Sequence, residues 1–197
     1  MREMIQMVVV LTILSCVSGI LLASIESGTK EQIAYQQLKF VKGPAIRSIL
    51  EGASNDPIVD RFKLKDGEVE RDFFVGVFDG QANTVAFETS GKGYGGDVEL
   101  MVGVDLSDGK IVGVGVTTHS ETPGVGSRAK DEPELAVQFK GLPLEGEFKV
   151  KTDGGEVDAL SGATVTSRAV ATGVTEAVEI YNRLKSQLDD KAKEYAK

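Results

Sequence analysis

Val98-Glu-Leu-Met-Val-Gly-Val-Asp105 and Lys110-Ile-Val-Gly-Val-Gly-Val-Thr117, joined through Ser107-Asp108-Gly109, are the residues that decide the fold class. Two apolar, β-branched runs around an Asp-Gly turn are typical of a β-hairpin. Residues 73–78 and 84–89 form a second such pair, around Asp79-Gly80. Consecutive hairpins predict a mainly antiparallel sheet instead of a parallel sheet with alternating helices.

The segments around these hairpins carry weaker patterns. Residues 30–53 show imperfect helical spacing, interrupted by Gly43-Pro44, and residues 55–69 are rich in turn residues. After the hairpins, the sequence predicts a short helix over residues 132–140, with Asp131 as its cap and Pro133 in its first turn, and a short strand near 148–150.

The C-terminal region predicts one long helix from Thr166 onward. Its apolar residues recur every three or four positions and form one stripe: Val170, Val174, Val178, Tyr181, Leu184 and Leu188. Only polar, charged and Ala residues follow Leu188, so the last turns are expected to be solvated or frayed. The predicted fold class is therefore α+β, with flanking helices around the sheet and a long C-terminal helix.

The N-terminus carries a candidate membrane anchor. Residues 4–25 contain no charge and would span roughly 33 Å as a helix, enough to cross a bilayer core. A cleaved signal peptide is the alternative, but its apolar region is usually shorter and ends in a small-x-small site. We expect an uncleaved transmembrane anchor over residues 1–28, a connecting region over 29–70 and one domain over 71–197. The charges around the anchor do not decide its direction.

Composition excludes several classes of function. The chain has 197 residues and a net charge of −8, with no basic stripe, which argues against nucleic-acid binding. The single Cys16 excludes an internal disulfide and a thiolate metal cluster, and the single His119 excludes a site that needs several His ligands.

The segment Asp158-Ala-Leu-Ser-Gly-Ala-Thr-Val-Thr-Ser167 is the first candidate site, because it runs into the start of the long helix. Free N–H groups and the positive end of the helix dipole suit a phosphate, and small Gly162 and Ala163 permit close approach. Four hydroxyls lie within seven residues: Ser161, Thr164, Thr166 and Ser167. A plain N-cap is the alternative, and local chemistry does not choose among the hydroxyls.

Two further segments are candidates. His119-Ser-Glu-Thr-Pro-Gly-Val-Gly126 follows a strand, and its His119 and Glu121 are either an acid/base pair or part of a surface turn. Ser90-Gly-Lys-Gly-Tyr-Gly-Gly96 is glycine-rich but precedes a strand, so the dinucleotide-binding interpretation fails. Tyr94 could stack on a ring and Lys92 could meet a phosphate, or the segment could be a simple connection.

These three segments, in this order and behind an N-terminal anchor, resemble the FMN-binding G subunit of the Rnf electron-transport complex. A more distant resemblance is to the C subunit of the sodium-pumping NADH:quinone reductase. The resemblance extends over nearly the whole chain, and its most specific part is the D-x-x-[S/T]-G-A-T motif at 158–164.

The resemblance implies a covalent cofactor. In such proteins a flavin transferase joins FMN through its phosphate to a threonine, which corresponds to Thr164, and Asp158 and Ser161 are recognition positions. Val125 replaces the usual Leu of the second loop. The residues expected around the flavin are Gly93, Tyr94, Gly95, Gly96, His119, Glu121, Thr122, Pro123, Gly124, Gly126, Ser161, Gly162, Ala163, Val165 and Thr166.

The resemblance also implies a role. It predicts an electron carrier that is not catalytic alone, within a complex that moves electrons between ferredoxin and NAD and translocates ions. The domain is expected outside the cytoplasmic membrane, on the periplasmic side of a single-pass anchor, with the other subunits as partners. The alternatives are an anchored, non-redox binding or scaffold domain, and an anchored hydrolase that uses Ser120, His119 or Glu121.

Overall fold

The computed structural model describes residues 1–196, and its contacts form two compact units, Met1–Leu38 and Lys39–Lys197. The first unit is almost entirely the helix α1, Arg2–Gln36, in which no side chain is buried. This helix is long and apolar enough to cross a membrane.

The helix does not break at Gly43-Pro44. A π-helical segment, Gln37–Lys42, leads directly into α2, Gly43–Ile49. Pro44 lies in the first turn of α2, where a missing N–H costs no helical hydrogen bond. The predicted interruption therefore corresponds to a change of helix type.

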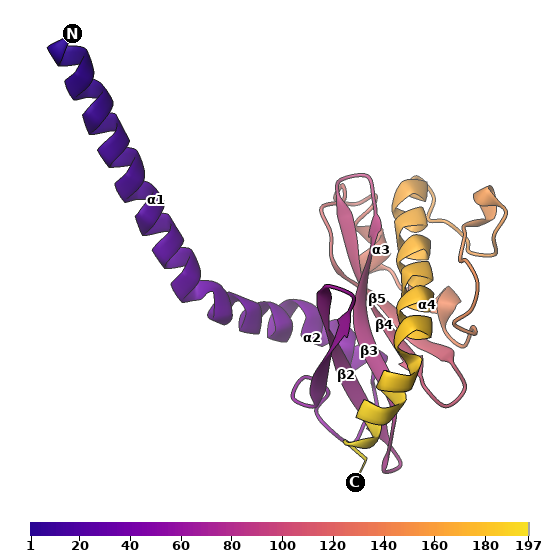
Figure 1. Cartoon of the computed structure of the whole chain (residues 1–197). Coiled ribbons are helices and arrows are strands. Elements are labelled where there is room, and N and C mark those ends of the chain that lie inside the picture. Colours follow the sequence, from indigo (N-terminus) through magenta and orange to yellow (C-terminus); the bar gives the residue numbers. More distant parts are fainter. Residues whose placement is uncertain (197) are drawn as a thin grey trace. The chain divides into compact units, whose positions relative to one another are not determined.

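The second unit is built on a five-stranded antiparallel sheet whose strands follow one another in chain order (Figure 1). Each neighbouring pair is antiparallel, which confirms the fold class predicted from the hairpins. The strands are β1 Arg61–Asp66, β2 Val69–Phe78, β3 Gln81–Lys92, β4 Asp97–Asp105 and β5 Lys110–Thr118.

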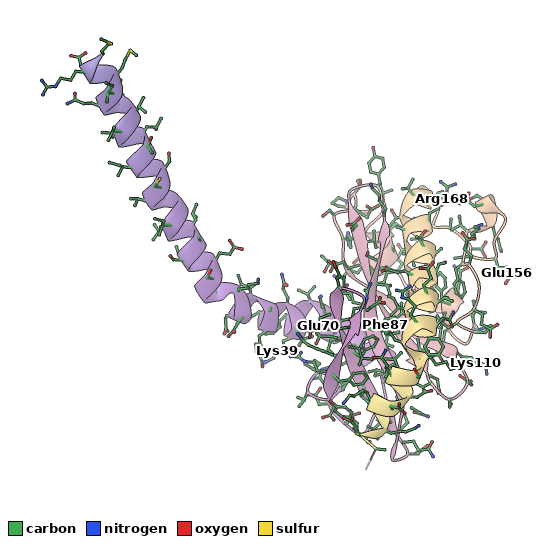
Figure 2. All side chains as sticks on the ribbon, viewed as in Figure 1. Lys39, Glu70, Phe87, Lys110, Glu156 and Arg168 are labelled. Atoms are coloured by element: carbon green, nitrogen blue, oxygen red, sulfur yellow. The ribbon has the colours of Figure 1, made fainter. Side chains whose placement is uncertain are left out.

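Helices cover both faces of this sheet. The long helix α4, Thr164–Lys193, packs its apolar stripe on the face that carries Phe73, Phe87 and Val102 (Figures 1 and 2). Alternate residues, such as Phe74 and Met101, are buried on the opposite face. There α2 contacts β4 and β5.

The predicted turn-rich region contains a strand that the sequence pattern did not reveal. In β1, Phe62 and Leu64 are buried and their neighbours are exposed, the alternation of an edge strand. The turn residues that dominated this region, Asp56-Pro57 and Asp66-Gly67, lie just outside the strand or at its end.

The predicted helix over 132–140 is also wrong. A four-residue helix, α3, Arg128–Asp131, ends at Glu132, whose backbone is extended (φ −113°, ψ 129°). Glu132 precedes Pro133, and a residue before proline is disfavoured in the helical region. A short 3₁₀ helix, Ala136–Phe139, follows, and the predicted strand at 148–150 is reduced to one bridge between Val150 and Val157.

The turns after Leu188 are partly solvated, as expected, with Asp190, Lys193 and Glu194 exposed, but they are helical and not frayed. α4 continues to Lys193, and Ala192 is buried. Tyr195 donates a hydrogen bond to the carbonyl oxygen of Arg61 at 2.8 Å. Tyr195 therefore fastens the segment just after α4 to the edge strand β1.

Candidate functional site

The three candidate segments meet at one end of the sheet. The β3–β4 turn and the C-terminal end of β5 lie at the same end of the sheet, because Lys92 pairs with Asp97 and Glu99 pairs with Thr118. A hollow of about 390 Å³ lies between these loops and the start of α4. Its lining residues are Tyr94, Glu121, Thr122, Val125, Gly126, Gly162, Ala163, Thr164, Val165 and Thr166.

The start of α4 is open toward a ligand. Gly162 turns the chain into the helix with φ +79°, a left-handed conformation that favours glycine. Ala163 is the N-cap residue and provides no side-chain cap, and the first turn contains no acidic residue. The first N–H groups of a helix have no intrahelical partners, so this end attracts an anion.

The structure separates the four hydroxyls of the segment. Ser167 is buried; its Oγ accepts from the Leu160 N–H and donates to the Ala163 carbonyl oxygen, both at 3.0 Å. Thr166 is buried and donates to Glu121. The Thr164 and Ser161 hydroxyls have no hydrogen-bond partner within residues 1–196, and of these two only Thr164 lines the hollow.

Glu121 joins the three segments. Its side chain is only 6% exposed, and its Oε1 accepts from the Gly95 N–H at 2.7 Å. Its Oε2 accepts from the Thr166 hydroxyl. Both carboxyl oxygens of this buried side chain therefore have donors, and the β3–β4 turn is fixed to the first turn of α4.

Close packing at Gly126 maintains this arrangement. A Cβ atom there would lie 2.7 Å from the Glu121 Cβ and 2.8 Å from the Thr166 Oγ1. Real side chains do not approach so closely, so Glu121 and Thr166 can meet only if residue 126 is glycine.

Several predicted residues that do not line the hollow form hydrogen bonds within the loops around it. The Nδ1 of His119 accepts from the Glu121 N–H at 3.2 Å, and the Gly124 N–H donates to the Ser127 Oγ at 2.9 Å. The Gly93 N–H donates to the Gly96 carbonyl oxygen at 2.8 Å and closes the β3–β4 turn. The predicted residues that do not line the hollow are His119, Pro123, Gly124, Gly93, Gly95, Gly96, Asp158 and Ser161.

The motif residues Asp158 and Ser161 lie on the surface, where another protein could reach them. The Asp158 carboxylate pairs with Lys151 at 2.7 Å. The Gln138 amide fixes the backbone of Asp158, accepting from its N–H at 2.7 Å and donating to its carbonyl oxygen at 3.1 Å.

Sequence reasoning missed Gln138 and Arg128 because both act across long separations in the chain. Arg128 donates to the Ser161 carbonyl oxygen at 3.2 Å and is also paired with Glu132. The hydrogen bond from Arg128 lowers the pKa of the Glu132 carboxyl. No motif marks these partners; only the fold brings them beside the segment.

The donor set fits a phosphorylated organic group better than a metal ion. Within residues 1–196 no three His, Cys, Asp or Glu side chains are grouped closely enough to hold a metal. The hollow instead offers an uncapped helix start, a free hydroxyl and apolar or aromatic side chains at its edge, Tyr94, Val125 and Val165.

The antiparallel sheet with a hollow at the start of its long helix belongs to the FMN-binding class of domains, because residues 93–179 match the FMN-binding domain family. The match begins inside the segment at residues 90–96, contains the other two segments and ends in α4.

The particular family follows from whole-chain relatives. The chain is 31% identical to the G subunit of the ion-translocating oxidoreductase complex of Vibrio cholerae, over 91% of this chain and 90% of that protein. It is 36% identical to the G subunit of the same complex from Stutzerimonas stutzeri, over 70% of this chain but only 64% of that protein. It is 32% identical to the G subunit of the proton-translocating ferredoxin:NAD(+) oxidoreductase complex of Clostridium ljungdahlii, over 86% of both. The chain therefore belongs to the G-subunit family of ion-translocating oxidoreductase complexes.

A solved structure agrees with this assignment. The C subunit of the Na(+)-translocating NADH-quinone reductase of Parabacteroides distasonis matches with a TM-score of 0.51 at 26% identity. The match covers 59% of this chain and 63% of that one.

Proposed function

We propose that this chain is a membrane-anchored electron-transfer subunit that carries FMN as a phosphoester on Oγ1 of Thr164. The observation that carries the proposal is the position of this hydroxyl. Thr164 lies at the uncapped start of α4, lines the hollow and has no hydrogen-bond partner in the described chain.

The neighbouring hydroxyls are less suitable. Thr166 and Ser167 are buried and already hydrogen-bonded, so their use as nucleophiles would break contacts that hold the site. Ser161 is exposed and does not line the hollow. Thr164 alone combines a free hydroxyl with the helix N–H groups that favour phosphate oxygens.

The attachment is a phosphoryl transfer. A flavin transferase would move the whole FMN moiety from a flavin dinucleotide to Thr164: a P–O bond to Oγ1 forms as the pyrophosphate P–O bond breaks, and the nucleoside monophosphate is the leaving group. The hydroxyl proton departs with that leaving group, and the protein gains FMN less one water. Exposed Asp158 and Ser161 are the proposed recognition positions for this enzyme.

The residues around the hollow would hold the group once it is attached. FMN, when bound, supplies reversible acceptance of one or two electrons, while the protein sets its position and environment. Tyr94, Thr122 and Val125 form one partly apolar side of the hollow. The hydrogen bonds of Glu121 to Gly95 and Thr166, called the Glu121 clamp below, hold that side in place. His119 acts through its contact with the Glu121 backbone and not as an acid or base.

Family membership supports the place of this subunit in a complex. We propose that it passes electrons between other subunits of a complex that couples ferredoxin and NAD chemistry to ion translocation. We also propose that the domain lies on the periplasmic side of the membrane and that α1 is its single-pass anchor. An acidic domain carrying one bound redox group does not provide a complete reaction by itself.

The test is the intact mass of the full chain after expression with and without a flavin transferase. Wild type is expected to gain the mass of FMN less one water only with the transferase, and Thr164→Val is expected to gain nothing. Thr172→Val removes an exposed hydroxyl two turns along α4 and is expected to behave as wild type. Full attachment to Thr164→Val would overturn the proposal.

A further inference from the structure

Arg168 lies one helical turn after Thr164, on the same side of α4. Side chains four residues apart in a helix have Cβ atoms about 5–6 Å apart, and helical side chains lean toward the N-terminus. Figure 2 shows Arg168 at the N-terminal end of α4. A phosphate on Thr164 would therefore lie within reach of this guanidinium.

Asp153 holds Arg168 in one orientation. The Arg168 Nε and Nη2 atoms donate to the two carboxylate oxygens of Asp153, at 2.5 and 2.7 Å. This hydrogen-bonded contact lowers the pKa of Asp153, so the pair is ionised at neutral pH. Fixing the side chain in advance reduces the entropy that a ligand would otherwise have to overcome.

The contact leaves part of the guanidinium available. Arginine has five N–H donors in a planar fork, and the side-on contact with Asp153 uses two of its nitrogens. The Nη1 atom has no hydrogen-bond partner within residues 1–196. Arg168 can thus bind a second anion without releasing the first.

The local charges give such an anion a role. The first turn of α4 has neither an acidic residue nor a side-chain cap to balance the positive end of the dipole. Arg168 lies in the next turn, and its charge is balanced by its ion pair with Asp153, from the 3₁₀ helix Lys151–Asp153. A phosphate diester at Thr164 would place a negative charge at the uncapped start of the helix, where the dipole favours it.

We infer that Arg168 is a positioning residue, oriented by Asp153, that binds the phosphate of the FMN on Thr164. This inference rests on the attachment proposed above. The phosphate is then held from two directions, by the helix N–H groups and by the free edge of the guanidinium. Charge-assisted hydrogen bonds of this kind are short and directional, so they also limit rotation about the ester.

α4 contains a matched control at its other end. Arg183 makes the same two-nitrogen contact with Asp66, at 2.8 and 2.8 Å, on the same helix and with a similar exposed fraction. Arg183→Gln removes the same charge and the same kind of ion pair, but far from Thr164 along the helix.

The experiment uses the full chain in detergent, expressed with and without the transferase. For wild type, Arg168→Gln, Arg168→Lys and Arg183→Gln, one records the ³¹P NMR resonance of the diester and the Tm of the loaded and unloaded forms. The loaded-minus-unloaded difference in Tm cancels the loss of the ion pair itself, which is present in both forms.

Arg168→Gln is expected to move the ³¹P resonance and to reduce the Tm difference by about 2–4 °C. Arg168→Lys is expected to restore part of both, and Arg183→Gln is expected to change neither.

Two results would overturn the inference. One is a ³¹P resonance and a Tm difference in Arg168→Gln that match those of Arg183→Gln. The other is loss of attachment in both Arg168 variants, which would assign Arg168 to recognition by the transferase. A wild-type chain without any phosphorus signal would instead refute the proposed function, and the inference with it.

Discussion

The two ends of α4 differ in how many of their polar groups are hydrogen-bonded and how well their apolar side chains are buried. At the C-terminal end, Arg183 contacts Asp66, Leu188 is fully buried and Tyr195 is hydrogen-bonded to Arg61. At the N-terminal end the helix has no side-chain cap, the Thr164 hydroxyl has no partner in the described chain, and Val165 is 41% exposed.

This difference indicates that the C-terminal end of α4 serves the fold and its N-terminal end serves the site. The C-terminal end is completed by contacts within the chain, so it contributes to stability. The N-terminal end is held in shape by the Glu121 clamp but leaves donors and apolar surface available, as a site for an external group requires. Substitutions at the two ends should therefore have different consequences.

The largest effect is expected from Leu188→Ala at the C-terminal end. Removing a fully buried leucine leaves a cavity and should lower the free energy of unfolding by about 2–5 kcal/mol. Val165→Ala at the other end should cost less than about 0.5 kcal/mol. Urea unfolding of the full chain measures both. Loss of flavin attachment in folded Leu188→Ala, with normal stability, would remove the distinction between the ends.

A smaller effect is expected from Thr166→Val in the clamp. It removes the donor to Oε2 of buried Glu121 and should cost about 1–3 kcal/mol, because a buried polar oxygen then lacks its partner. Thr164→Val serves as the control. The hydroxyl that it removes has no such partner, so the stability of the unloaded chain should be nearly unchanged. Equal unfolding midpoints for the two variants would contradict the role assigned to the clamp.

The smallest effect concerns pH at the C-terminal end. The hydrogen bond from Arg183, with a further one from Arg71, lowers the pKa of Asp66 below its ordinary value of 3.8. A lowered folded-state pKa adds stability above the ordinary value, and that stability is lost as pH falls through the lowered pKa.

Asp66→Asn should therefore cost about 1 kcal/mol near neutral pH, and its difference from wild type should disappear in acid. Asp153→Asn should show a weaker form of the same dependence, because Asp153 is 33% exposed against 9% for Asp66. Thermal unfolding across the acid range tests both variants, and a difference for Asp66→Asn that persists at the lowest pH would refute the assignment.

The sheet and the long helix could be predicted because their signals are local. Asp-Gly turns between β-branched runs and the stripe from Val170 to Leu188 encode β2–β5 and α4 directly. The edge strand β1 was hidden by the turn residues at its ends. The fastening of Tyr195 to Arg61 could not be predicted, because it depends on a contact between residues 134 apart.

The site was predictable in part for the same reason. Motif spacing indicated all three segments but not how they are joined. That Glu121 bridges Gly95 and Thr166, that Gln138 holds Asp158 and that Asp153 orients Arg168 are long-range contacts that no local pattern reveals. Burial and existing hydrogen bonds then distinguish Thr164 from its neighbouring hydroxyls, which sequence chemistry alone could not do.

The most direct test of the central claim is fragmentation mass spectrometry of the peptide that contains residues 158–167, from full chain matured with its transferase. We predict the flavin phosphate on Thr164, with Ser161, Thr166 and Ser167 unmodified. A flavin phosphate on Ser161, Thr166 or Ser167, or an unmodified peptide from protein that retains its flavin, would contradict this prediction.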